Sequence, residues 1–301
     1  SVLRVQGTNS GTGTGGLRAI AGATPPPGAG NAVETTTRLL DLEDPLQPGT
    51  SAPLFADGQV LELAGATKGS RTVPPSRLSI GAGTTLADLM SFLTRALGVS
   101  EGAGANPDGR TPGATLDAAT GVLTLVGNAG RVNDLDLEPS DLRLLSPTGA
   151  FLRAPFATGK DVAADGESVR TSFLAYDSLG ATVQADLTMV LDSRSASGTR
   201  WRYFIESPDD AGDALALGTG VLDFDTQGRL SSTTIPSVSI DRTGTGALSP
   251  LTLDLIFARG QSTVTALSGE PSEIASNFRD GAPFGTLSTY AVGRDGLITG
   301  S

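Results

Sequence analysis

The sequence predicts a mainly β, multi-domain protein, built of antiparallel β-barrel or sandwich domains with one small inserted α+β domain. Glycine (40 residues) and proline (18 residues) are abundant in this chain of 301 residues, and both mark turns. Several short segments alternate apolar and polar residues with the period of a strand, whereas only one segment has a convincing helical period. The chain length also lies near the size at which one core divides into several.

The N-terminal segments predict strands and loops. Residues 1–6 form a candidate short strand. Residues 11–16 match the G-x-G-x-x-G fingerprint of dinucleotide sites, which needs a following helix to hold a pyrophosphate. The three prolines at 25–27 leave no room for that helix, so we expect a flexible loop. A β-prone segment at 31–42 and a linker at 44–53 follow.

Residues 56–154 predict the small α+β domain. Asp57-Gly58 opens a hairpin-like sequence with candidate strands at 60–63 and 77–80. A helix is expected near 85–97, because its residues have the features of both helix ends and an apolar stripe. We expect this domain to be inserted into the surrounding β protein.

The helix is defined by its caps and its stripe. Thr85 is a candidate N-cap with Asp88 at the third helical position, and Gly98 stands where a glycine commonly ends a helix. The apolar stripe consists of Leu86, Leu89, Met90, Leu93 and Leu97. A lone helix of this length needs tertiary packing, so the stripe is expected to cover a local sheet rather than dock a partner. The expected covering partners are 122–126, Leu135, Leu137, Leu142 and Leu144.

Residues 171–230 predict a β-meander. An apolar run ends at Asp177-Ser178, whose side chains can bond to their own backbone, and Gly180 supplies a positive φ. A strand at 181–191, a polar turn at 192–198, an aromatic strand at 201–205 and a strand–turn–strand at 221–230 complete the pattern. The expected structural anchors are Tyr176, Asp177, Gly180, Trp201, Phe204, Phe224 and Gly228.

The aromatic strand leaves two interpretations open. Trp201 and Tyr203 share one face, and Arg202 and Phe204 share the other. Exposed rings would suit stacking on sugars, but anchoring a core is the preferred interpretation.

The acidic segments are interpreted as turns and solvated loops. Residues 223–228 begin like an EF-hand loop, but position twelve is Thr234 where calcium requires a bidentate glutamate. We therefore expect a hairpin turn there. Asp209, Asp210 and Asp213 are expected to form a solvated face rather than a cation site.

Composition excludes most catalytic chemistry. The chain has no histidine and no cysteine, which removes the Ser-His-Asp triad, the cysteine nucleophile and the usual zinc ligands. The lysines are Lys68 and Lys160, and neither lies in a Ser-x-x-Lys motif; the 32 carboxylates include no pair that the sequence singles out for glycoside hydrolysis. We expect no enzyme, no cofactor and no metal.

Charge and hydropathy also limit the partners. The net charge of −11 argues against nucleic acid and anionic membrane as partners. No apolar run approaches the roughly eighteen residues of a membrane span. The sequence starts at Ser1 without a signal peptide, which suggests a piece of a longer protein.

Three motifs carry a resemblance to a known family. They are Tyr-Asp-Ser-Leu-Gly at 176–180, Trp201 some twenty residues on, and Leu-x-Phe-Asp-x-x-Gly-x-Leu at 222–230. Together with residues 280–300, they resemble the middle domain of bacterial flagellar hook proteins and the segment that leads back to the inner domain. The resemblance covers about 168–301. Hook proteins often have Asn and His after the turn, where this chain has Gly180-Ala181-Thr182.

The resemblance implies a domain plan. An inner β domain is expected from residues 1–35 and 259–301, and a middle β domain from 36–55 and 155–258. Residues 56–154 form the inserted domain. The family's helical terminal segments, which build the inner tube, are not part of this sequence, so this fragment alone is expected to be a monomer.

The resemblance also implies a function. Hook proteins form a curved tube that acts as a universal joint and passes motor torque to the filament. The implied partners are other copies of the chain, hook cap proteins and hook–filament junction proteins. The implied location is the extracellular flagellum, reached by export without a cleaved signal peptide. Candidate intersubunit loops carry Asp192, Arg194, Asp209, Asp210 and Asp213, and the outer face of the inserted domain is a further candidate. The alternative is an extracellular carbohydrate-binding or adhesin-type β module.

Overall fold

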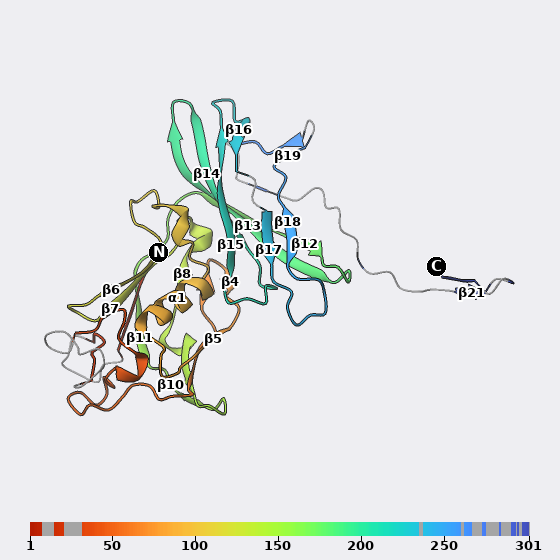
Figure 1. Ribbon diagram of the computed structural model, residues 1–301. Coiled ribbons are helices and arrows are strands. Elements are labelled where there is room, and N and C mark those ends of the chain that lie inside the picture. The colour runs from red at the N-terminus through yellow and green to blue at the C-terminus, as the bar shows by residue number, and fades with distance from the viewer. Residues whose placement is uncertain are drawn as a thin grey trace.

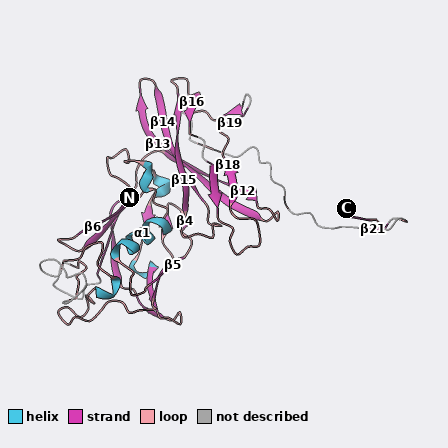
Figure 2. Cartoon of the chain, viewed as in Figure 1, coloured by secondary structure: helices cyan, strands magenta, loops and turns pink. Residues whose placement is uncertain are grey.

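The structure is a computed structural model, and it confirms a mainly β chain made of antiparallel sheets (Figures 1 and 2). It describes residues 1–7, 15–20, 32–234, 237–259, 262–266, 273–274, 283, 290–292, 294 and 297–300. Within these residues no sheet closes into a barrel, and one α-helix is present. No helix in the described part is long and apolar enough to cross a membrane. Residues 11–14 of the glycine-rich motif lie outside the described residues.

Three small sheets form the helix-bearing part of the molecule. In the first, β1 (Val2–Gly7) lies between β11 (Phe156–Val162) and β7 (Val122–Val126), with β6 (Gly113–Asp117) at the edge. The second has the order β10 (Phe151–Arg153), β9 (Leu142–Leu145), β2 (Val60–Leu63) and β5 (Ser76–Ser79). The third joins β4 (Arg71–Thr72), β3 (Thr67–Lys68) and β8 (Leu135–Asp136). Short 3₁₀ turns lie at Leu39–Asp41, Glu101–Ala103, Arg131–Asn133 and Pro139–Asp141.

The predicted helix is confirmed as α1 (Leu86–Ala96). The Thr85 hydroxyl accepts a bond from the Asp88 N–H, and Asp88 accepts one from the Thr85 N–H in return, which completes a capping box. Gly98 ends the helix with φ +62°. These two caps satisfy backbone groups that a short helix would otherwise leave unpaired.

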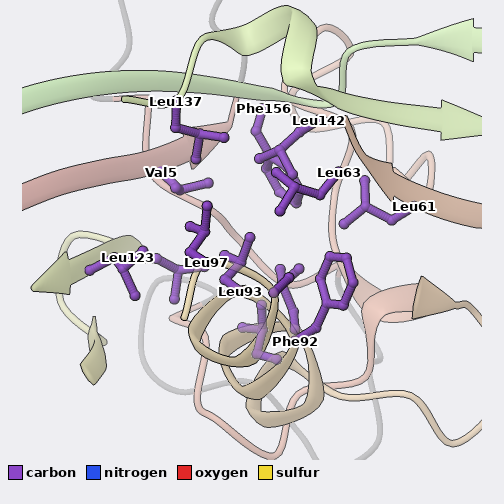
Figure 3. Packing of buried hydrophobic residues seen from close by; sticks show 14 of the residues in the cluster. Val5, Leu61, Leu63, Phe92, Leu93, Leu97, Leu123, Leu137, Leu142 and Phe156 are labelled. Atoms are coloured by element: carbon purple, nitrogen blue, oxygen red, sulfur yellow. The ribbon is translucent and has the colours of Figure 1, made fainter. Parts of the chain in front are cut away.

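The helix stripe enters the first hydrophobic core (Figure 3). Leu86, Leu89, Leu93 and Leu97 are buried, and Phe92, which the predicted stripe omitted, is buried with them. The expected partners Leu123, Leu125, Leu135, Leu137, Leu142 and Leu144 lie in the same cluster. Burying one such side chain contributes about 1.5–3 kcal/mol, so this cluster, rather than helix propensity, holds α1 in place.

The predicted meander is a five-stranded antiparallel sheet. Its strands, in spatial and chain order, are β12 (Ser168–Tyr176), β13 (Thr182–Ser195), β14 (Gly198–Glu206), β15 (Ala216–Phe224) and β16 (Leu230–Thr233). The predicted polar turn at 192–198 is wrong in its extent. Strand β13 passes a bulge between Leu191 and Ser193 and continues to Ser195, where it still pairs with Gly198. Polar residues remain in the strand because its end is exposed.

A second core covers one face of this sheet. Leu187, Met189, Trp201, Tyr203, Ile205, Leu222 and Phe224 form it with Val238 and Phe257. Tyr203 and Phe257 pack with ring centroids 5.2 Å apart. The paired strands β17 (Ser237–Ile240) and β18 (Leu251–Asp254) contribute Val238 to the cluster. The remaining described strands are β19 (Ala258–Arg259), β20 (Ser262–Thr263), β21 (Tyr290–Val292) and β22 (Ile298–Gly300).

The domain boundaries stay a prediction. Among the described residues, Leu3 and Val5 of β1, Leu39, Leu42 and Leu54 lie in the same hydrophobic cluster as α1. The sheet β12–β16 has the second cluster on one face. Its other face points toward the helix-bearing part, and charged side chains of the two parts meet there.

Candidate functional site

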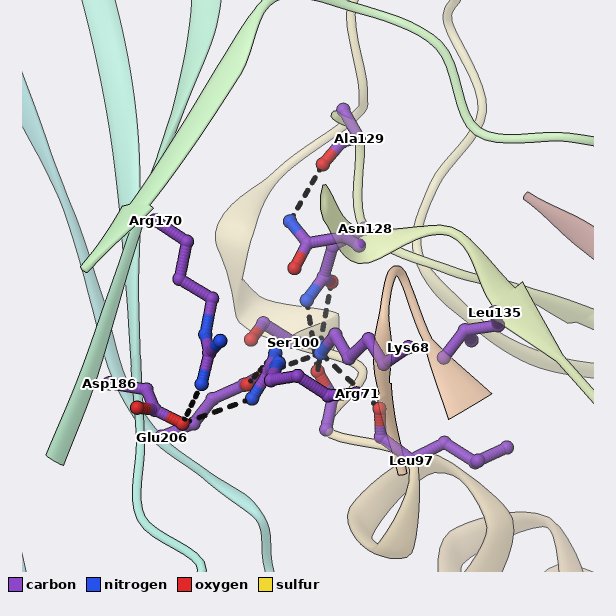
Figure 4. Close-up of polar contacts among 12 residues, drawn as sticks. Lys68, Arg71, Leu97, Ser100, Asn128, Ala129, Leu135, Arg170, Asp186 and Glu206 are labelled. Carbon is purple, nitrogen blue, oxygen red and sulfur yellow. Dashed lines mark hydrogen bonds and ion pairs between the residues drawn. The ribbon is translucent and has the colours of Figure 1, made fainter. Parts of the chain in front are cut away.

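The two faces of the five-stranded sheet differ in chemistry. Side chains alternate across a strand, so odd-numbered residues of β13 and β14, such as Trp201 and Tyr203, enter the second core. Even-numbered residues point the other way, and they include Asp186 on β13 and Glu206 on β14, which are direct cross-strand partners. These carboxylates face cations of the helix-bearing part (Figure 4). We call this contact the ionic junction: Lys68, Arg71, Arg170, Asp186 and Glu206.

Lys68 of β3 crosses the junction from the helix side. Its Nζ donates to the Gly98 carbonyl at 2.8 Å, to the Leu97 carbonyl at 3.3 Å and to Glu206 Oε1. The two carbonyls belong to the C-terminal end of α1, where the helix dipole favours a cation. All three ammonium donors are therefore used, and both charged side chains are at most 1% exposed.

Arg71 joins the two carboxylates. Its Nη2 donates to Glu206 Oε2 at 2.6 Å, and its Nη1 donates to Asp186 Oδ2 at 3.2 Å. On the sheet itself, Arg170 Nη2 donates to Asp186 Oδ2 at 2.5 Å and Ser172 Oγ donates to Asp186 Oδ1 at 2.6 Å. Gln184 Nε2 adds a bond to the same oxygen at 3.0 Å. Asp186 is thus held from both sides of the junction, whereas both cations that bind Glu206 come from the helix-bearing part.

This arrangement keeps both carboxylates ionised. Burial alone would raise the pKa of Glu206, but the charges of Lys68 and Arg71 outweigh it and hold that pKa below its ordinary value. Burial likewise opposes ionisation of Asp186, yet hydrogen bonds from Ser172 and Arg170 lower its pKa. Burial lowers the pKa of Lys68, against the attraction of Glu206.

The rim of the junction is also polar. Arg202 of β14 donates to the carbonyls of Gly104 and Ala105 and, at 2.6 Å, to Asp192. Leu215, just before β15, adds an apolar contact because it lies in the first core. Its N–H donates to the Arg95 carbonyl at 3.0 Å. The contact therefore combines charged side chains and carbonyls with buried apolar side chains of the same face, such as Val190 and Phe204.

The predicted anchors divide between the two faces. Trp201 and Phe224 lie in the second core, whereas Phe204 is fully buried on the opposite face and Tyr176 is half-buried. The two turn glycines have positive φ, +79° at Gly180 and +73° at Gly228. These positions are described by the structure; their importance stays a prediction.

Asp177 closes the β12–β13 turn. Its Oδ1 accepts bonds from the N–H groups of Leu179 and Ala181 at 3.0 Å each, and Arg242 Nη2 donates to Oδ2 at 3.1 Å. Asp225 closes the β15–β16 turn in the same way, with bonds from Gln227 and Arg229. The hairpin expected in place of an EF-hand is therefore confirmed.

The five loop residues predicted for intersubunit contact all have partners within the chain. Asp192 accepts from Arg202, and Arg194 donates to Glu167 at 2.5 Å. Asp209 accepts from the Gln184 N–H, Asp210 from the Asp241 N–H, and Asp213 pairs with Arg95 at 2.8 Å. In the part of the chain that the structure describes, no group of three or more acidic side chains could hold a metal ion.

Sequence reasoning missed the ionic junction. Lys68 and Glu206 are 138 residues apart, and no local pattern pairs them. One weak signal was available: Glu206 directly follows the aromatic run of β14, whereas Asp186 takes an ordinary polar position in the alternation of β13. A carboxylate on the buried stretch of a strand calls for a cationic partner.

Residues 153–282 match the family model of the flagellar basal body protein FlaE D2 domain. The chain resembles a flagellar hook protein. The matched segment begins at Arg153 in β10 and contains the whole five-stranded sheet, so the hook-type segment carries Asp186 and Glu206, and the cations Lys68 and Arg71 lie outside it. The matched family is a structural family of the flagellum and not an enzyme family. No curated protein sequence matched the chain.

Proposed function

We propose that this chain is a structural subunit of the bacterial flagellar hook, where it passes motor torque to the filament as part of a flexible universal joint. The observation that carries the proposal is the match of residues 153–282 to a hook-protein domain. Bending of such a tube needs stiff subunits whose mutual contacts can change.

The ionic junction would supply the stiffness that each subunit needs. Two cations from the helix-bearing part meet two carboxylates from the sheet, and these directed bonds fix the angle between the parts. Breaking such a buried pair is expensive because it leaves an uncompensated charge. The sheet and the helix-bearing part therefore move as one rigid body when force is applied.

The proposal includes partners and location. Other copies of the chain form a helical tube through the full-length protein, and hook cap and hook–filament junction proteins contact its ends. The subunit lies outside the cell after export without a cleaved signal peptide, and it performs no catalysis. No observation favours a carbohydrate-binding module, since Trp201 is 8% exposed and Tyr203 is fully buried.

Deletion of the gene and labelling of the protein test this function. The chain has no cysteine, so Thr226→Cys in the exposed β15–β16 turn gives one reactive thiol in this segment. We expect the deletion strain to lack hooks, and the complemented strain to show maleimide dye confined to hooks. Normal hooks in the deletion strain, or dye absent from hooks, would overturn the proposal. A strain complemented with the unsubstituted gene is the control for labelling.

A further inference from the structure

Two exposed leucines project from the end of the sheet. Leu179 in the β12–β13 turn is 57% exposed, and Leu248 in the loop between β17 and β18 is 77% exposed. The Leu248 N–H donates to Ser178 Oγ at 2.7 Å, so the two loops lie together. We call Leu179 and Leu248 the leucine tip.

The loops that present the leucine tip are held rigidly. Asp177 binds its own turn and also Arg242 of the second loop. Arg242 Nη1 donates to the Asp209 carbonyl at 2.8 Å, and the Asp241 N–H donates to Asp210 Oδ1 at 2.6 Å, which ties in a third loop. Preordered loops lose little conformational entropy on binding. Exposed leucines on such a support are suited to a docking contact.

The leucine tip stands in an acidic setting. Its three loops, at 177–181, 207–213 and 241–250, contain five aspartates and one arginine. One of these aspartates, Asp213, is paired with Arg95 of α1. Four carboxylates then remain against the single guanidinium of Arg242, so a partner surface should be apolar and positively charged.

A surface of that kind lies on the sheet β10–β9–β2–β5. An open groove of about 600 Å³ is lined by Glu62, Arg77, Ser140, Arg143, Leu145, Gly149, Phe151 and Ala154. Phe151 is 62% exposed. Arg77 pairs with Glu62 at 2.8 Å, which leaves the charge of Arg143 uncompensated by the acidic lining. We call this surface the Phe151 groove.

One copy does not place its tip beside its own groove. The turn after β12 and the strand β10 lie in different parts of the molecule (Figure 1). The contact must therefore join different patches on two copies, and such head-to-tail contacts generate rings or open helical arrays.

We propose that the leucine tip of one copy seats in the Phe151 groove of a second copy. This inference rests on the proposed hook function. Two leucines bury far less than the roughly 1,200–2,000 Å² of a stable interface. The contact is therefore weak between free molecules and forms inside a tube, where the effective concentration is high.

Cysteine pairs in the full-length protein test the contact. Hooks built from the Leu248→Cys, Phe151→Cys variant should give, after mild oxidation, a ladder of linked subunits on a non-reducing gel. The single variants and the pair Leu248→Cys, Thr226→Cys should stay monomeric. Hooks that assemble without a ladder, or equal linkage in Leu248→Cys alone, would overturn the inference. Failure to find the chain in hooks would instead overturn the proposed function.

A double-mutant cycle gives a second measurement that needs no cysteine. Leu248→Ser and Phe151→Ser should each lower the temperature at which hooks depolymerise by several degrees. The double variant should be no worse than the more affected single variant, because both remove one contact. Additive shifts, or no shift in the single variants, would count against the contact.

Discussion

Glu206 has the most demanding position of any single side chain in the junction. It is fully buried, and its two carboxylate oxygens bind Lys68 and Arg71 separately. Removing its charge leaves Lys68 buried without its carboxylate partner, and Arg71 keeps only Asp186. A buried ion pair can add little stability compared with an apolar contact of the same size. Removing one partner is nevertheless destabilising, because the other charge is left buried.

Glu206→Gln is expected to lower the free energy of unfolding by about 3–5 kcal/mol, the usual cost of breaking a buried pair. Urea titration followed by fluorescence of Trp201, the one tryptophan in the chain, measures the change. Glu62→Gln is the matched control, because its partner Arg77 is 68% exposed and such pairs contribute about 0–1 kcal/mol. Equal effects of the two substitutions would show that the buried pair contributes no more to stability than an exposed one.

Gly98 is the residue that allows the junction to close. Its φ is +62°, and a Cβ atom there would lie 2.9 Å from both Lys68 Nζ and Glu206 Oε1. Gly98→Ala should destabilise the protein by at least about 1–2 kcal/mol, the strain of a left-handed residue. Gly102→Ala, which would meet nothing within 4 Å, should change stability little. Chemical denaturation of both variants checks this difference.

Among the elements, α1 has the clearest local determinants. Thr85→Ala removes the hydroxyl that accepts the Asp88 N–H and should cost about 0.5–2 kcal/mol. Ser91→Ala, on the exposed face of the same helix, should be neutral or slightly stabilising because alanine is the better helix former. Thermal unfolding followed by circular dichroism measures both. A neutral Thr85→Ala would show that tertiary packing alone sets the start of the helix.

Helix and turns could be predicted from the sequence because their determinants are local. Thr85, Asp88 and Gly98 define α1 within fourteen residues, and Asp177 with Gly180 defines a turn within four. The extent of β13 could not be predicted, since its polar end is stabilised by pairing with β14 rather than by its own pattern. The junction could not be predicted either, because Lys68 meets Glu206 only after both parts have folded.

At the scale of the whole molecule, the ionic junction makes the contact between the two parts depend on pH. The folded-state pKa values of Asp186 and Glu206 lie below their ordinary values of 3.8 and 4.5. Groups of this kind contribute stability that is present above the ordinary pKa and lost as pH falls toward the folded-state pKa. Acid should therefore weaken the contact between the parts.

We expect unfolding stability to fall as pH drops below about 4.5, with a steeper decline in the wild type than in the Asp186→Asn, Glu206→Gln variant. Urea titrations between neutral and acidic pH measure both slopes. The variant is less stable at neutral pH, so its slope and not its absolute stability is the readout. Parallel slopes would mean that other carboxylates govern acid unfolding.

The five-stranded sheet has a hydrophobic core on one face and buried salt bridges on the other. Cooling weakens the attraction between apolar surfaces, whereas warming reduces the cost of stripping water from ions. The layer formed by β17 and β18 should then be the first to loosen at low temperature, and the ionic junction should be the better preserved at high temperature. The contact that limits the stability of the fold should therefore differ between low and high temperature.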